Sequence, residues 1–77
     1  MSERLFSSVV MASRLSDVVG SYAIARLLLN AEVSPRDVTP EGLERALPRI
    51  EAGLAVYLRG DELEAAVRDV RSLVAQA

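Results

Sequence analysis

Four residue types are missing from this chain: cysteine, histidine, tryptophan and lysine. Without cysteine the chain has no disulfides and no thiolate ligands for a metal. Without histidine it lacks the side chain that most often acts as a general base or a metal ligand near neutral pH. The four glycines are dispersed, so there is no glycine-rich loop to hold a phosphate. We therefore expect no enzymatic activity, no metal site and no cofactor.

The charged residues are balanced and well mixed. All nine basic residues are arginines, and they are interspersed among eleven carboxylates for a net charge of −2. No block of one sign is present to attract nucleic acid or an anionic membrane over long range, so we expect neither as a partner. The amino terminus lacks the basic and apolar regions of a signal peptide, and we expect a cytoplasmic protein.

The apolar fraction is high for so short a chain. The chain has 77 residues, enough for one domain, and 51% of them are apolar. A domain of this size buries only about 60% of the surface of its unfolded chain. With disulfides and metals excluded, self-association is the remaining way to stabilise it.

The most informative segment is residues 3–29, which we predict as one long helix. On a helical wheel it carries two apolar seams on roughly opposite faces. The first seam contains Leu5, Val9, Ala12, Ser16, Val19, Ala23 and Leu27. The second seam contains Met11, Leu15, Val18, Tyr22, Ala25 and Leu29. A helix at the edge of a domain needs one apolar seam, so we expect partners on both sides of this one. It would bend most easily at Ser16-Asp17 and at Gly20.

Two proline signals follow the first helix. Ser34-Pro35 and Thr39-Pro40 both have the cap-then-proline order that begins a helical turn. They predict a turn over residues 35–38 and a second helix over residues 40–59.

The second helix contains Pro48, which predicts a kink near that residue because proline cannot donate a backbone hydrogen bond. Gly60 is suited to the left-handed conformation past a helix end. Asp61 and Glu64 then have the spacing of a capping box, which predicts a short third helix over residues 62–75. The short connection makes the last two helices an antiparallel hairpin.

The sequence as a whole predicts an all-α fold. It is a small helical bundle with one long two-seamed N-terminal helix, a proline-kinked second helix and a short third helix, completed by oligomerisation. The hairpin offers enough apolar surface to cover one seam of the first helix. We expect the remaining surface to form a homodimer or higher oligomer, or to bind a second protein encoded nearby. The predicted interface residues are Val9, Met11, Ala12, Leu15, Ser16, Val18, Val19 and Tyr22.

Two alternative functions remain open. Residues 31–38 resemble the turn of a DNA-binding helix-turn-helix, which would make the chain a small DNA-associated regulator or antitoxin. However, Glu32 occupies the usual glycine position, and Pro40 would interrupt the recognition helix. The second alternative is a membrane-associated helical subunit, because residues 5–29 are long enough to span a bilayer. The three charged residues within that span would each cost about 2.5–3.5 kcal/mol near the bilayer centre.

Several short runs in the middle of the chain resemble a known class of module. They are the run from Gly20 to Leu29, then Val38-Thr39-Pro40-Glu41-Gly42-Leu43 and Leu47-Pro48-Arg49-Ile50. Residues 20–58 are in this respect similar to small helical interaction modules of bacterial signalling and regulatory proteins. The resemblance implies a protein–protein interaction role, as a scaffold, adaptor or regulatory subunit, with no catalytic residues.

Overall fold

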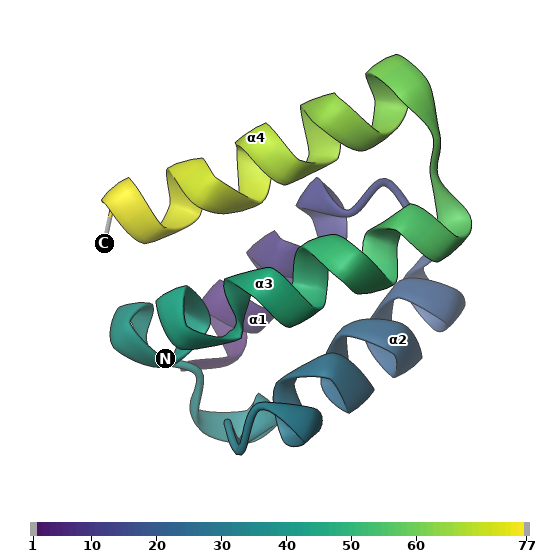
Figure 1. Ribbon diagram of the computed structural model, residues 1–77. Coiled ribbons are helices and arrows are strands. Elements are labelled where there is room, and N and C mark those ends of the chain that lie inside the picture. Colours follow the sequence, from purple (N-terminus) through teal and green to yellow (C-terminus); the bar gives the residue numbers. More distant parts are fainter. Residues whose placement is uncertain (1, 77) are drawn as a thin grey trace.

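The computed structural model describes the backbone of residues 2–76 and the side chains of residues 4–76. Helices account for most of this part of the chain, and it contains no strand. The elements are α1 (Ser2–Ala12), α2 (Asp17–Asn30), the short 3-10 helix η1 (Pro35–Asp37), α3 (Pro40–Tyr57) and α4 (Gly60–Gln76) (Figure 1). The all-α prediction is confirmed.

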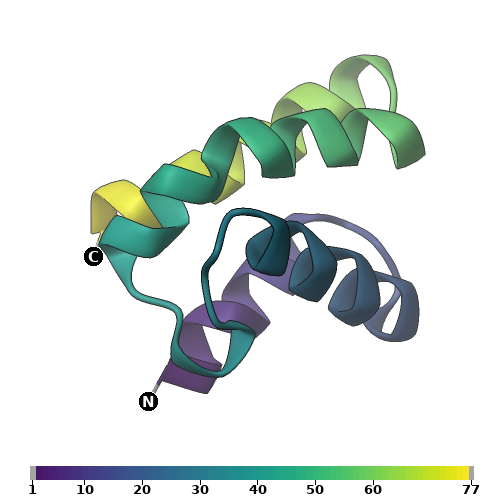
Figure 2. The ribbon, with the colours of Figure 1, turned by 60° about the horizontal axis from the view of Figure 1, so that its bottom comes forward.

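The helices form two layers. Figure 2 shows α3 and α4 side by side in one layer, with α1, α2 and η1 in the other. Between the layers, α3 contacts α2 and α4 contacts α1, and the helices of each layer also contact each other. The four helices therefore close into a ring, and each helix has two helical neighbours.

The long helix predicted over residues 3–29 is interrupted, so this part of the prediction is wrong. α1 ends at Ala12 and α2 begins at Asp17. The Ser16 hydroxyl accepts a hydrogen bond from the Val19 N–H at 3.2 Å, which caps the start of α2. The break thus ends at the Ser16-Asp17 pair, one of the two places where the sequence indicated an easy bend, whereas the other, Gly20, lies inside α2.

A buried serine stabilises this break. Arg14 has a φ of 62°, the left-handed conformation that ends many helices, and its N–H bonds to the Met11 carbonyl at 3.2 Å. The hydroxyl of Ser13 is fully buried; it donates to the Val10 carbonyl and accepts from the Leu15 N–H at 3.3 Å. The Ser13 hydroxyl therefore gives the Leu15 N–H its acceptor at the break, and the Val10 carbonyl accepts from the backbone N–H of Ser13 as well.

The end of α2 is also set by a residue in the left-handed conformation. Glu32 has a φ of 62°. Its N–H bonds to the Leu29 carbonyl at 2.9 Å, and the Val33 N–H bonds to the Leu28 carbonyl at 2.8 Å. This pair of bonds is the Schellman motif, completed by the burial of both Val33 and Leu28. A glutamate thus occupies a conformation in which glycine is usual.

The second half of the chain follows the proline and glycine signals. α3 begins at Pro40, where the Thr39 hydroxyl accepts from the Gly42 N–H at 3.0 Å, and it ends at Tyr57, two residues short of the predicted 40–59. It continues through Pro48 without a break, and the kink there stays a prediction. Gly60 has a φ of 59° and begins α4, which extends beyond the predicted range of 62–75 at both ends.

The core lies between the two layers. Its largest fully buried side chains come from all four helices and from the break after α1: Val9, Ser13, Ile24, Leu28, Leu43, Ile50, Leu54 and Val70. Ser13 is the polar member of this set, and its hydroxyl is satisfied as described above. One side of α2 therefore packs into the core, and its other side faces solvent.

Candidate interaction surface

Seven large apolar side chains are exposed among the described residues. They are Met11, Val18, Val19, Tyr22, Leu29, Val56 and Tyr57, with exposed fractions between 43% and 82%. Val18 and Met11 are the most exposed, at 82% and 76%. Six of the seven lie on two neighbouring helices, and these six are called the α2–α3 surface: Val18, Val19, Tyr22 and Leu29 of α2 with Val56 and Tyr57 of α3.

Helix geometry explains why these α2 side chains face outwards together. The buried residues of α2 are Gly20, Ala23, Ile24 and Leu28, which share one side of the helix. At 100° per residue, Val18 and Leu29 lie within about 40° of Tyr22 on the opposite side. The outer side of α2 is therefore a stripe of apolar residues, where a helix at the edge of a domain normally carries charges.

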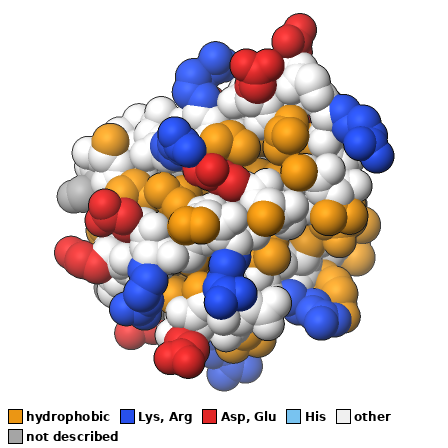
Figure 3. All heavy atoms as spheres, viewed as in Figure 1, with side chains coloured by type: hydrophobic (Ala, Val, Ile, Leu, Met, Phe, Trp, Pro, Cys, Tyr) orange, Lys and Arg blue, Asp and Glu red, His pale blue; other side chains and the backbone are white. Residues whose placement is uncertain are grey.

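The surface continues from α2 onto α3 across a shallow hollow. Tyr22, Arg26 and Leu27 line one wall, and Gly53, Val56 and Tyr57 line the other, around a volume of about 250 Å³. In Figure 3 the apolar side chains gather at the right-hand side of this face, over the start of α2 and the end of α3.

The helices come close together at Gly53. A β-carbon added at Gly53 would lie 2.5 Å from a terminal carbon of Leu27. The absence of a side chain at this position therefore allows Leu27, which lines the hollow, to pack against the backbone of α3.

One charge lies on the outer side of α2. The Arg26 guanidinium donates to the Tyr22 hydroxyl at 3.0 Å and lies 5.7 Å from the centroid of the Tyr22 ring. The hydrogen bond to Tyr22 raises the pKa of Arg26 above its ordinary value. The hydrogen bond and the position of the guanidinium over the ring together hold the Tyr22 side chain in place on the surface.

The eight predicted interface residues do not lie on a single face. Val9 is fully buried in the core, so it cannot contact a partner, and Ala12 and Leu15 are half-buried. Met11, Ser16, Val18, Val19 and Tyr22 are exposed. Of these, Val18, Val19 and Tyr22 lie on the α2–α3 surface, Met11 lies near the end of α1, and Ser16 caps α2.

Three residues of the surface were not among the predicted set. Leu29 belongs to the second apolar seam of the sequence, so periodicity indicated it. Val56 and Tyr57 join the surface only because the end of α3 lies beside Tyr22 and Arg26 of α2. Sequence periodicity within one helix carries no signal for such a contact.

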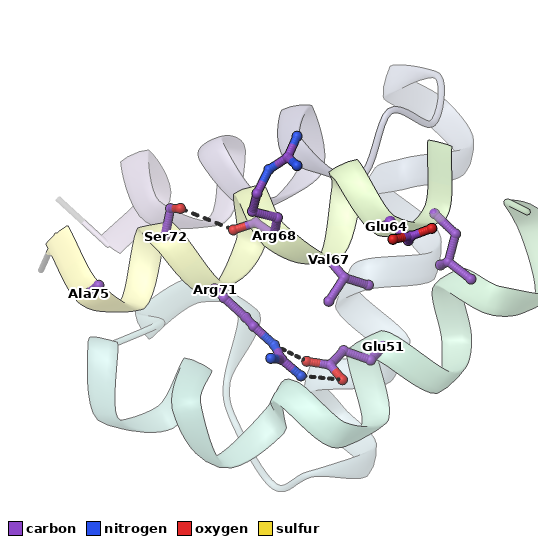
Figure 4. Close-up of a pocket in the computed structure, with 8 residues that line it drawn as sticks. Glu51, Glu64, Val67, Arg68, Arg71, Ser72 and Ala75 are labelled. Carbon is purple, nitrogen blue, oxygen red and sulfur yellow. Dashed lines mark hydrogen bonds and ion pairs between the residues drawn. The ribbon is translucent and has the colours of Figure 1, made fainter. Parts of the chain in front are cut away.

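A second hollow lies between α3 and α4 and has a different character. It encloses about 720 Å³ and is lined by Leu63 and Val67 together with charged side chains. Figure 4 shows Arg71 extending from α4 to Glu51 on α3, with hydrogen bonds of 2.7 and 3.1 Å. This pair raises the pKa of Arg71. The carboxylate and the guanidinium satisfy each other across the hollow, so it presents no unpaired charge at this point.

Among the described residues no group of three or more acidic side chains is placed to hold a metal ion. No helix of residues 2–76 has the length and apolar character needed to cross a membrane. Comparisons of the chain with protein-family models, with curated proteins and with solved structures find no match.

Proposed function

We propose that this chain is a protein–protein interaction module that self-associates through the α2–α3 surface. As a homodimer or higher oligomer it would act as a scaffold, adaptor or regulatory subunit in bacterial signalling or regulation. The chemistry is the burial of apolar side chains on association, at about 25 cal/mol per Å² removed from water.

The observation that carries the proposal is the outer side of α2. Val18, Tyr22 and Leu29 are 82%, 63% and 59% exposed, whereas the opposite side of the same helix packs into the hydrophobic core. Scattered exposed apolar residues are ordinary, but a continuous patch on a small domain marks an interaction site. Tyrosine and arginine, here Tyr22, Tyr57 and Arg26, are also the residue types most enriched where binding energy is concentrated.

The exposed apolar area is of the size that a stable interface needs. Each partner of a standard interface contributes about 800 Å², of which roughly 450 Å² is non-polar. A whole aromatic side chain has a surface of about 150–250 Å². Tyr22 and Tyr57 are 63% and 49% exposed, so together they present an exposed area on the order of 200 Å². The four aliphatic residues of the surface supply the remainder.

The test compares two aspartate substitutions at exposed helical positions. Val18→Asp places a charge within the α2–α3 surface, whereas Ala55→Asp places one on α3 outside that surface. We expect Val18→Asp to weaken association at least tenfold and Ala55→Asp to leave it unchanged, as measured by light scattering over a concentration series. Circular dichroism checks that both variants keep their helices. Equal association by both variants would contradict the proposal.

A further inference from the structure

The outer side of α2 has a spacing that fits a particular partner. Its apolar stripe consists of Val18, Tyr22, Ala25 and Leu29, with steps of four, three and four residues. This is the spacing with which one helix packs along another in a coiled coil. The steps are the same when read from either end, so the stripe of one copy is complementary to the stripe of a second copy that runs in the opposite direction.

We propose that two copies of this chain pair through α2 in antiparallel orientation, about a twofold axis. Tyr22 of each copy lies opposite Ala25 of the second copy, and Val18 lies opposite Leu29 of the second copy. The inference rests on the proposed self-association and specifies its geometry. A twofold pair closes on itself, so the assembly would be a dimer.

Side-chain size favours the antiparallel over the parallel orientation. Antiparallel pairing sets the large Tyr22 against the small Ala25 twice, and such alternation of large and small residues fills an interface evenly. Parallel pairing would set Tyr22 against Tyr22 and Ala25 against Ala25, which gives one crowded layer and one empty layer. Antiparallel helix dipoles also attract, whereas parallel dipoles repel.

Charge places no obstacle to this pairing. The stripe itself is uncharged, and Arg26, the one charge beside it, is turned towards Tyr22 and the α2–α3 hollow. Arg26 can therefore remain at the rim of the interface, where a guanidinium keeps its contact with water.

Single cysteines provide the test, because the chain has none of its own. Val18→Cys and Leu29→Cys variants are prepared separately, and each is first shown by sedimentation equilibrium to associate as the parent does. They are then oxidised alone and as an equimolar mixture, and the disulfide-linked species are identified by mass spectrometry. Ala55→Cys, on exposed α3 outside the surface, reports random collision.

The antiparallel dimer predicts a disulfide between Val18→Cys and Leu29→Cys chains in the mixture and little linkage in either variant alone. In this arrangement the two residues 18 lie eleven helical positions apart, or about 16 Å along the axis. A disulfide requires α-carbons within about 7 Å, so residue 18 cannot link to itself. We expect the mixed species to exceed each self-linked species at least tenfold.

Every other outcome contradicts either the antiparallel geometry or the proposed self-association. Self-linkage of Val18→Cys, with the parent chain dimeric, means parallel pairing and contradicts the antiparallel geometry while self-association stands. Association without linkage of any pair above the Ala55→Cys level places the interface elsewhere and also overturns the inference. A parent chain that is monomeric in sedimentation overturns both the inference and the proposed function.

Discussion

The outer sides of α2 and α4 differ although both helices pack on the same core. α4 faces solvent with charged residues, and one of them, Arg71, is hydrogen-bonded to Glu51 of α3. α2 faces solvent with Val18, Tyr22 and Leu29. The solvent-facing side of α4 is thus polar, as in a helix at the edge of a complete domain, whereas that of α2 is apolar. A second molecule on α2 would remove the difference.

The strongest test of this comparison sets the two sides of α2 against each other. Ile24→Ala removes a fully buried side chain, and we expect the free energy of unfolding to fall by about 2–5 kcal/mol. Val18→Ala, on the outer side, should lower it only where the dimer is populated, because a bound partner adds stability by mass action. Urea denaturation at several protein concentrations measures both effects. If Val18→Ala still lowers the free energy of unfolding at high dilution, the prediction that Val18 adds stability only in the dimer is wrong.

The corner between α1 and α2 gives the next largest effect. Ser13→Ala leaves the Leu15 N–H without its side-chain acceptor, and the expected loss is about 1–2 kcal/mol of unfolding free energy. Ser8→Ala is the matched control, because the Ser8 hydroxyl bonds the Arg4 carbonyl of the same helix at an exposed position. Thermal denaturation of the two variants should separate them. Equal stability would mean that the buried hydroxyl is not needed to hold the break.

The smallest effect is expected on the charged side. Glu51→Gln weakens the contact with Arg71, whose side chain is 62% exposed, and we expect a smaller fall in the free energy of unfolding than for Ser13→Ala. The difference should shrink in high salt, which screens exposed charges. Glu44→Gln, an exposed carboxylate on the same helix, is the control in urea denaturation. A cost that is unaffected by salt would show that packing rather than charge is responsible.

Local signals predicted the second half of the chain better than the first. Proline at 40 fixes a φ that suits the first turn of a helix, and glycine at 60 permits the left-handed conformation, so the start of α3 and the turn into α4 could be predicted from residue type. The break before α2 depends on Ser13 being buried and on Arg14 adopting a left-handed conformation. Neither the burial of Ser13 nor the left-handed conformation of Arg14 can be predicted from residue type, because serine and arginine also occur inside exposed helices.

The same break explains which interface residues were predicted and which were not. A continuous helix would have kept Val9 and Val19 on one seam, but the turn at residues 13–16 reorients α2, so Val9 is buried and Val19 is exposed. Within α2 the periodicity held, and the seam with Val18, Tyr22 and Leu29 is the side that faces solvent. The contribution of α3 required tertiary structure.

Sedimentation equilibrium of the unmodified protein decides whether the α2–α3 surface binds a second copy of this chain. At tens of micromolar we expect a mass of twice the 8.3 kDa chain, with dissociation on dilution. A mass of 8.3 kDa at every concentration in that range would contradict it.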